Sequence, residues 1–260
     1  MPITRVGASQ ASALGGVTSR VLTVTPTAVG NLLVVGFLVS NSAASPSVSV
    51  TTGTAHTFVV ANTLNQDATN AGSLLSWYTI ATVTSALTIT VQSNVAAQFC
   101  SMSLEEFTGT HLTDPFDAMV NSADGASGTP ISPTITPVAA DCLVWASAYD
   151  NITAVGNIGG SAATKGADDL NADWTEFRVL TGGAGVGITA AFTGSGAFNV
   201  MAATFKPASA GGALFTPRSQ SRPFPYAPGS ARARMWWPVM ALTAPGDLWM
   251  SVDVFMSLFL

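Results

Sequence analysis

Short runs of β-branched and aromatic residues recur along the first 206 residues, and Gly, Asn, Asp, Ser or Pro separates each run from the next. Such runs are typical of β-strands bounded by turns. No long window has apolar residues at the i, i+3, i+4, i+7 spacing of an amphipathic helix. The pattern therefore predicts an all-β protein. The expected strands are 20–25, 31–40, 46–52, 56–61, 73–82, 86–92 and 98–107, then 131–136, 142–149, 173–180, 185–192 and 197–206.

Two stretches of the chain resemble each other. "TVTPTAVGNLLVV" at 23–35 is echoed by "TITPVAADCLVW" at 134–145, and Ile89-Thr90 by Ile188-Thr189. Loops of different length would explain why the offset drifts along the chain. We expect two duplicated Greek-key halves, about 20–110 and 131–207, that close into one antiparallel, jelly-roll-like β-sandwich over 20–207. Chance similarity between Thr- and Val-rich strands is the alternative explanation of the echo.

The two ends of the chain differ from this pattern. Residues 1–19 are expected to form an N-terminal arm, and residues 208–234 are rich in Pro, Gly and Ser, which is typical of an extended linker. Residues 235–260 are apolar and predict a segment that docks on a neighbouring subunit. An arm folded back over its own sandwich is the alternative. The candidate partner-binding residues are Arg232, Arg234, Trp236, Trp237, Trp249 and Phe255.

Charge is scarce and unevenly distributed. Charged residues make up 9% of the chain, and the formal net charge is −5. Residues 1–206 hold five basic and twelve acidic residues, a balance of −7, whereas residues 207–260 hold four arginines and two aspartates, a balance of +2. An acidic protein of this kind is not expected to bind nucleic acid. A surface with so little charge has weak protection against association, as suits a subunit of an assembly. Pro238, Pro245 and Asp247 interrupt the apolar terminal segment, so no membrane span is expected.

No residue set predicts a defined reaction. The two histidines, His56 and His111, lie outside HExxH and GxSxG motifs. Glu105 and Glu106 are neighbours on an expected strand, so their side chains should point to opposite faces, one toward solvent and one near the sandwich rim. A glycosidase would therefore need a second carboxylate from elsewhere, such as Asp114 or Asp117.

One acidic stretch is a weak candidate for calcium. Asp169, Asn171 and Asp173 have the D-x-N-x-D spacing of a calcium loop, but Trp174 and Leu180 stand where that loop needs Gly and Glu. An ordinary acidic loop before a strand is the favoured interpretation. No nucleotide cofactor is expected, because no GxGxxG or P-loop motif occurs.

The two cysteines, Cys100 and Cys142, are too few for a disulfide scaffold. We expect buried free thiols, with a single bridge between them as the alternative.

Several strand phrases together resemble a known domain. They are "GNLLVVGF" (30–37), "LLSWYTIAT" (74–82) with "LTITV" (87–91), "SLEEFTG" (103–109) and "FNVMAATFK" (198–206). They are similar to a jelly-roll-like β-sandwich domain of bacteriophage virion and bacterial surface structural proteins. The resemblance covers 20–207, implies structural and binding roles, and carries over no catalytic residue.

These observations together predict a non-enzymatic virion structural protein: a capsid decoration, minor capsid or tail-associated subunit. Its partners would be copies of itself and other virion proteins. The alternative is a carbohydrate-binding, lectin-like adhesion module at the cell surface, with Trp77, Tyr78, Tyr149 and Trp174 as candidate sugar-stacking residues. A hydrolase is the third hypothesis.

Overall fold

The computed structural model describes residues 2–40, 46–52, 56–67, 72–123, 133–149, 152–168, 174–182, 184–194 and 199–208. The strands are β1 (Thr4–Val24), β2 (Leu32–Val39), β3 (Ser47–Thr52), β4 (Val59–Asp67), β5 (Gly72–Ile80), β6 (Leu87–Thr108), β7 (Phe116–Ala123), β8 (Thr134–Ile135), β9 (Cys142–Tyr149), β10 (Ile152–Ile158), β11 (Ser161–Ala162), β12 (Thr164–Asp168), β13 (Trp174–Leu180), β14 (Ile188–Gly194) and β15 (Asn199–Phe205). Their pairings are antiparallel, and the described residues contain no helix. The predicted antiparallel all-β class is confirmed.

The first half of the chain forms two layers that share two long strands. Residues 4–14 of β1 pair with 99–108 of β6, and residues 19–24 of β1 pair with 87–92 of β6. The register shifts between these two stretches, which is where a β-bulge lets a strand bend. One stretch of β6 pairs with β2, and the other pairs with β3. The result is an inner sheet, β1-β6-β2-β5-β4, and an outer sheet, β1-β6-β3.

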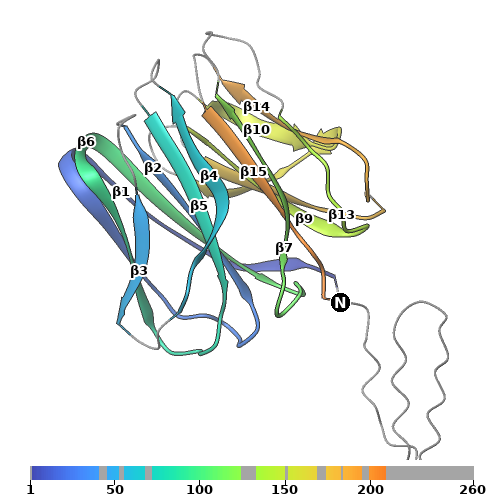
Figure 1. Ribbon diagram of the computed structural model, residues 1–260, viewed down its shortest axis with the longest axis horizontal. Helices are drawn as coiled ribbons and strands as arrows, with labels where there is room; N and C mark the ends of the chain where they lie inside the picture. The colour runs from blue at the N-terminus through green and yellow to red at the C-terminus, as the bar shows by residue number, and fades with distance from the viewer. Residues whose placement is uncertain are drawn as a thin grey trace, which may run out of the picture. The chain divides into compact units, whose positions relative to one another are not determined.

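The second half repeats this strand order. Its inner sheet has the order β7-β15-β9-β13-β12, and its outer sheet has the order β8-β14-β10-β11. In chain order, β7 and β8 correspond to the two stretches of β1, and β14 and β15 correspond to the two stretches of β6. Between them, β9 corresponds to β2 and β10 to β3. Likewise β12 corresponds to β4 and β13 to β5. Figure 1 shows the two halves side by side, blue to green and green to orange. The echo noticed in the sequence therefore coincides with a repeated strand order, as duplication would produce.

Three apolar cores fill the spaces between the layers. One lies inside the first half and contains Phe37, Trp77 and Met102. A second lies inside the second half and contains Ile135, Val144 and Ile188. The third lies between the two inner sheets and combines residues of both halves, including Leu32, Leu74, Phe107, Leu143, Trp145, Met201 and Phe205. The order across the molecule is thus outer, inner, inner, outer sheet.

This layering differs from the expected single sandwich closed by the two halves. Each half has a two-sheet core of its own, and the halves then pack face to face. The reason is visible in β2, where all eight residues are buried. A strand that is apolar on both faces needs a covering layer on each face, and a single two-layer sandwich provides only one.

Two expected boundaries also differ from the structure. β1 begins at Thr4 and pairs with β6, so most of the expected N-terminal arm 1–19 belongs to the first-half sheets. The stretch left between the expected halves contains β7, which pairs with β15 and completes the second inner sheet. Its sequence, "FDAMVNSA", lacks a run of β-branched residues, and pairing with β15 rather than local propensity makes it a strand.

A polar bridge also joins the halves. Asn62 of β4 is fully buried, and its Nδ2 donates to the carbonyl oxygen of Ala202 at 2.9 Å, to that of Val120 at 3.2 Å and to Asn121 Oδ1 at 3.1 Å. Ser76 Oγ donates to Asn62 Oδ1 at 2.7 Å. The amide thus ties β4 and β5 of the first half to β7 and β15 of the second. Within the part of the chain that the structure describes, no helix is long and apolar enough to cross a membrane.

Candidate functional site

The adjacent carboxylates Glu105 and Glu106 point to opposite faces of β6, but neither reaches solvent. Glu105 is fully buried and Glu106 is 4% exposed. The expectation that one faces water was wrong, because the inner sheet is covered on both sides. Glu106 Oε1 accepts hydrogen bonds from Asn31 Nδ2 at 2.6 Å and from both the backbone N–H and the hydroxyl of Thr27. This carboxylate holds the turn that leads into β2.

Glu105 occupies the interface between the two halves. Trp145 Nε1, from β9 of the second half, donates to its Oε2 at 2.6 Å. Arg5 Nη1 approaches its Oε1 at 3.4 Å, and the Arg5 guanidinium lies 5.0 Å from the centre of the Phe177 ring. Gly166 of β12 lies so close that a Cβ there would fall 1.9 Å from Oε1. The carboxylate is enclosed by protein, so its contacts indicate a structural role.

Each of the two histidines accepts a hydrogen bond from a backbone N–H. His56 Nε2 accepts from the backbone N–H of Thr82 at 3.1 Å. His111 Nδ1 accepts from the backbone N–H of Asp114, also at 3.1 Å. The His111 contact lies within one loop, whereas the His56 contact joins the residues before β4 to those after β5.

The remaining candidates for chemistry are partly outside the described residues. Asp169, Asn171 and Asp173 lie there, so calcium binding by them stays a prediction. Among the residues that are described, no group of three or more His, Cys, Asp or Glu side chains is arranged to hold a metal ion.

The two cysteines are buried free thiols, and the alternative of a bridge between them was wrong. Cys100 lies in the core of the first half and Cys142 in the core of the second, with the central interface between them. Burial raises the pKa of both thiols, to about 12 for Cys142, where the nearby carboxylates of Asp117 and Asp141 add to the effect.

Two of the four candidate sugar-stacking residues are committed to the fold. Trp77 is 3% exposed and packs inside the first-half core. The Tyr78 ring is stacked on Phe116, with ring centroids 5.7 Å apart, and meets the edge of Phe205 at 5.6 Å. The side chains of Tyr149 and Trp174 lie outside the described residues. Trp77 is therefore buried, and one face of the Tyr78 ring is covered by Phe116.

Residues 206–208, which follow β15, are bonded to the loop between β6 and β7. The predicted partner-binding residues Arg232, Arg234, Trp236, Trp237, Trp249 and Phe255 lie outside the described residues. Three backbone hydrogen bonds anchor residues 206–208. Lys206 N donates to Pro115 O at 2.6 Å, His111 N to Lys206 O at 3.0 Å, and Ala208 N to Gly109 O at 2.7 Å.

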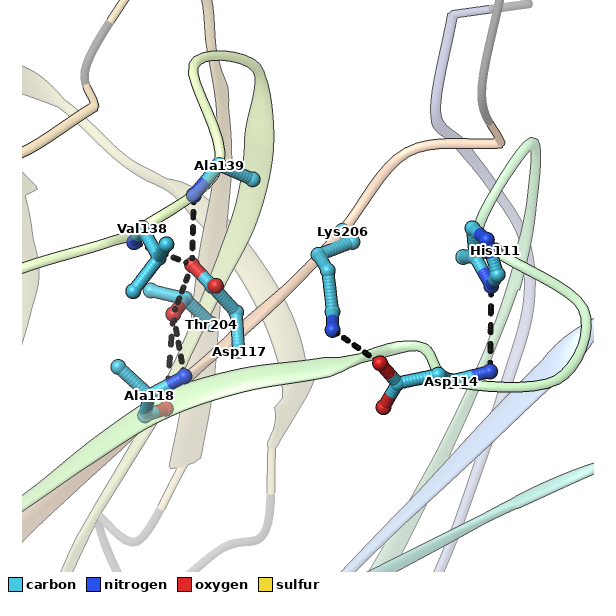
Figure 2. Close-up of polar contacts among 8 residues, drawn as sticks. All are labelled: His111, Asp114, Asp117, Ala118, Val138, Ala139, Thr204 and Lys206. Atoms are coloured by element: carbon cyan, nitrogen blue, oxygen red, sulfur yellow. Dashed lines mark hydrogen bonds and ion pairs between the residues drawn. The ribbon is translucent and has the colours of Figure 1, made fainter. Parts of the chain in front are cut away.

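Charged side chains reinforce this anchor (Figure 2). Lys206 Nζ forms an ion pair with Asp114, and its hydrogen bond is the main cause that lowers the pKa of that carboxyl. Asp117 Oδ2 accepts from Val138 N at 2.9 Å and from Thr204 Oγ1 at 3.3 Å. Burial, with a smaller effect from Asp114, raises the pKa of the Tyr78 hydroxyl nearby. The end of β15 is therefore held by Asp114 through Lys206 and by Asp117 through Thr204.

An apolar patch borders this anchor. We define the exit patch as the exposed side chains of Val29, Val59 and Leu112 together with the half-buried Tyr78 and Ile80. Backbone neighbours of Val29 and Ile80 are in contact, and so are two of the members themselves. Leu112 Cδ2 lies against Gly30, Gly30 N donates to Ala81 O at 2.8 Å, and Val59 pairs with Tyr78 across β4 and β5. Leu112 follows His111, which bonds to Lys206, so the patch borders the residues that follow β15.

Comparisons with protein-family models, with curated proteins and with solved structures found no match to this chain. The site is therefore interpreted from its own residues. Sequence analysis placed the partner contacts only in the terminal segment and missed the exit patch. Val29, Val59 and Leu112 carry no shared local signal, because turns and pairings far apart in the sequence bring them together.

Proposed function

We propose that this chain is a non-enzymatic structural subunit of a bacteriophage particle, as a capsid decoration, minor capsid or tail-associated protein. It would assemble with copies of itself and with other virion proteins through residues 208–260. The observation that carries the proposal is the anchored exit. Residues 206–208 are anchored beside exposed apolar side chains, and residues 209–260, which follow them in the sequence, hold three of the six tryptophans.

The charge distribution supports the same proposal. The balance of −7 over residues 1–206 and +2 over residues 207–260 favours contact between residues 207–260 and an acidic body, its own or a neighbour's. The low charge of the whole chain means that electrostatic repulsion between subunits is weak, so they can pack closely. Large buried sheets, as in the two inner layers, give a rigid body on which such contacts can be built.

A sedimentation experiment tests this function. Particles produced by the genome that encodes the chain would be separated on a density gradient, and the chain would be followed by quantitative mass spectrometry. The proposal predicts that it sediments with the particles at a fixed ratio to the major shell protein. A chain that stays in the soluble fraction while intact particles sediment would contradict the proposal.

The carbohydrate-binding alternative has less support. Two of its four candidate aromatics are occupied by packing, as described above. The remaining candidates for sugar binding are Tyr149, Trp174 and the predicted calcium ligands Asp169, Asn171 and Asp173. A glycan array run with and without a calcium chelator tests them. Chelator-sensitive binding to a defined glycan would favour the alternative over the structural role.

A further inference from the structure

We infer that the contact between the two halves is a two-fold dimer contact that duplication has made internal, in which Glu105 and Gly166 make each half selective for the other. In a two-fold contact, an element of one partner meets a second element of the other partner, and the reverse contact occurs as well. The inference concerns the central core alone and does not depend on residues 209–260.

The strands that meet across the central core are exchanged as two-fold symmetry requires. β4 of the first half lies against β7 and β15 of the second half. β12, which corresponds to β4, lies against β1 and β6, and these two strands correspond to β7 and β15. The edge strand of each half therefore covers the same two strands of the other half.

Aromatic contacts across the core repeat in the same way. Phe107 of β6 and Phe205 of β15 are equivalent, since each pairs with a leucine at the start of β2 or β9. Tyr78 of β5 and Phe177 of β13 are also equivalent, since each pairs with the residue two positions beyond that leucine. The Tyr78 ring meets the edge of Phe205 with centroids 5.6 Å apart, and the Phe177 ring meets Phe107 at 5.3 Å. One contact is thus the other with the halves exchanged.

A second ring contact follows the same rule. Arg5 of β1 and Phe116 of β7 are equivalent, because each pairs with one of these two phenylalanines and is followed by a register shift. The Phe116 ring stacks on Tyr78, and the Arg5 guanidinium lies over the Phe177 ring. Two chemically different side chains therefore cover equivalent rings from equivalent positions.

The symmetry is broken at one pair of positions. Glu105 and Ala203 are equivalent, since each lies two residues before the phenylalanine of its strand. Gly166 of β12 leaves room for Glu105, because a Cβ there would lie 1.9 Å from the carboxylate. Asn62 of β4 instead extends toward β15 and donates to the carbonyl oxygen of Ala202. A large side chain meets a small residue at both places, but the halves that supply them are exchanged.

Like halves would therefore not fit together. Asn62 and Gly166 occupy corresponding places, beside equivalent hydroxyl residues of β5 and β13. If two first halves met, Asn62 of one would stand against Glu105 of the other, where Gly166 now leaves space. Val34 would also replace Trp145, so the buried carboxylate would lose a hydrogen-bond donor. Overlap and the loss of a donor to a buried charge both oppose such a pair.

Substitutions in the intact chain test this fit. Gly166→Asn alone should lower the midpoint of urea denaturation, because the new side chain overlaps with Glu105. Adding Glu105→Ala reproduces the arrangement of Asn62 and Ala203 and should recover at least half of the loss. Gly166→Asn with Glu106→Ala is the matched control, since Glu106 lies on the opposite face of β6, and it should recover nothing. If Gly166→Asn with Glu105→Ala is no more stable than Gly166→Asn alone, the inference is wrong.

Separated halves test the selectivity. A protease site inserted between the exposed Leu112 and Thr113 would allow the full-length chain to be cut between its halves. The cut protein would be dissociated in urea, returned to buffer and examined by native mass spectrometry. The wild type should give pairs of unlike halves and no pair of two first halves. Glu105→Ala should give pairs of two first halves as well, whereas the control Glu106→Ala should not.

Three results of this second experiment would overturn the inference. They are wild-type halves that do not pair again, wild-type first halves that pair with each other, and Glu105→Ala first halves that do not. Pairs of two first halves contain no part of residues 209–260, so the readout is separate from the proposed function. If the halves pair selectively while removal of residues 209–260 leaves assembly unchanged, the inference stands and the proposed function fails.

Discussion

At the scale of single residues, Glu105 shows how the two halves are joined. A charge buried between two sheets is unfavourable unless it is paired, and here Trp145 and Arg5 provide that pairing. Sequence reasoning predicted correctly that Glu105 and Glu106 face opposite sides of one strand. It could not predict that both sides of the strand are buried away from water. The partners lie far along the chain: Trp145 is 40 positions from Glu105, and Thr27 is 79 positions from Glu106.

Removing the indole donor tests this pairing. In Trp145→Phe the carboxylate of Glu105 keeps its burial but loses the hydrogen bond from Nε1. We expect the free energy of unfolding to fall by about 1–3 kcal/mol, measured by urea denaturation. A double-mutant cycle with Glu105→Gln isolates the coupling between the two side chains. A coupling energy near zero would mean that this hydrogen bond does not stabilise the interface.

The raised pKa of the Cys142 thiol predicts a pH dependence of stability. A group whose pKa is higher in the folded state stabilises the protein below its unfolded pKa, and that stabilisation is lost as pH rises through the folded value. For Cys142 the loss should run from about pH 9 to about pH 12. We expect the wild type to lose on the order of 1 kcal/mol more than Cys142→Ala for each pH unit above 9. Parallel urea curves for the two proteins at pH 8 and pH 10.5 check this, and equal losses would contradict it.

At the scale of elements, the inner strands β2 and β9 set the layering. Their near-continuous apolar sequences were recognised as strands, but a continuous apolar run does not by itself reveal how many layers cover it. Gly36, in the middle of β2, marks a close approach of the two inner sheets. A Cβ at this position would lie 2.8 Å from Ser103 Oγ and 3.0 Å from the Trp145 ring.

Substitution of this glycine tests the close packing of the inner sheets. We expect Gly36→Ala to lower the free energy of unfolding by about 1–3 kcal/mol, because the added methyl group forces neighbours apart. Gly7→Ala is a matched control on β1, where the nearest atom to a new Cβ is an ordinary 3.4 Å away. Thermal denaturation of both variants measures the difference in stability between them. A Gly36→Ala variant as stable as the control would show that the sheets are less closely packed than described.

At the scale of the whole molecule, the repeated strand order and the shared central core make the two halves one unit. The echo between 23–35 and 134–145 was enough to suggest duplicated halves. It was not enough to place β7 or the first stretch of β1, since their sequences lack strong strand propensity and their partners lie far along the chain. Loop geometry, which creates the exit patch, was beyond sequence reasoning for the same reason.

Asn62 tests the cooperativity between the halves. Asn62→Ala leaves the buried Ala202 carbonyl and the Ser76 hydroxyl without this partner, and we expect a loss of about 2–3 kcal/mol. Because the central core is shared, unfolding should remain a single transition that tryptophan fluorescence and circular dichroism report at the same midpoint. Separate midpoints in the wild type would show that the halves unfold independently.

The role of residues 209–260 in assembly is tested most directly by the mass of the protein in solution. Sedimentation equilibrium would be run on the full-length chain and on a chain ending at Ala208, whose backbone N–H bonds to Gly109. We predict that the full-length chain forms a defined oligomer, whereas the shortened chain is a folded monomer with the same circular dichroism in its β-sheet region. A shortened chain that assembles to the same mass as the full-length chain would contradict this role of the terminal segment.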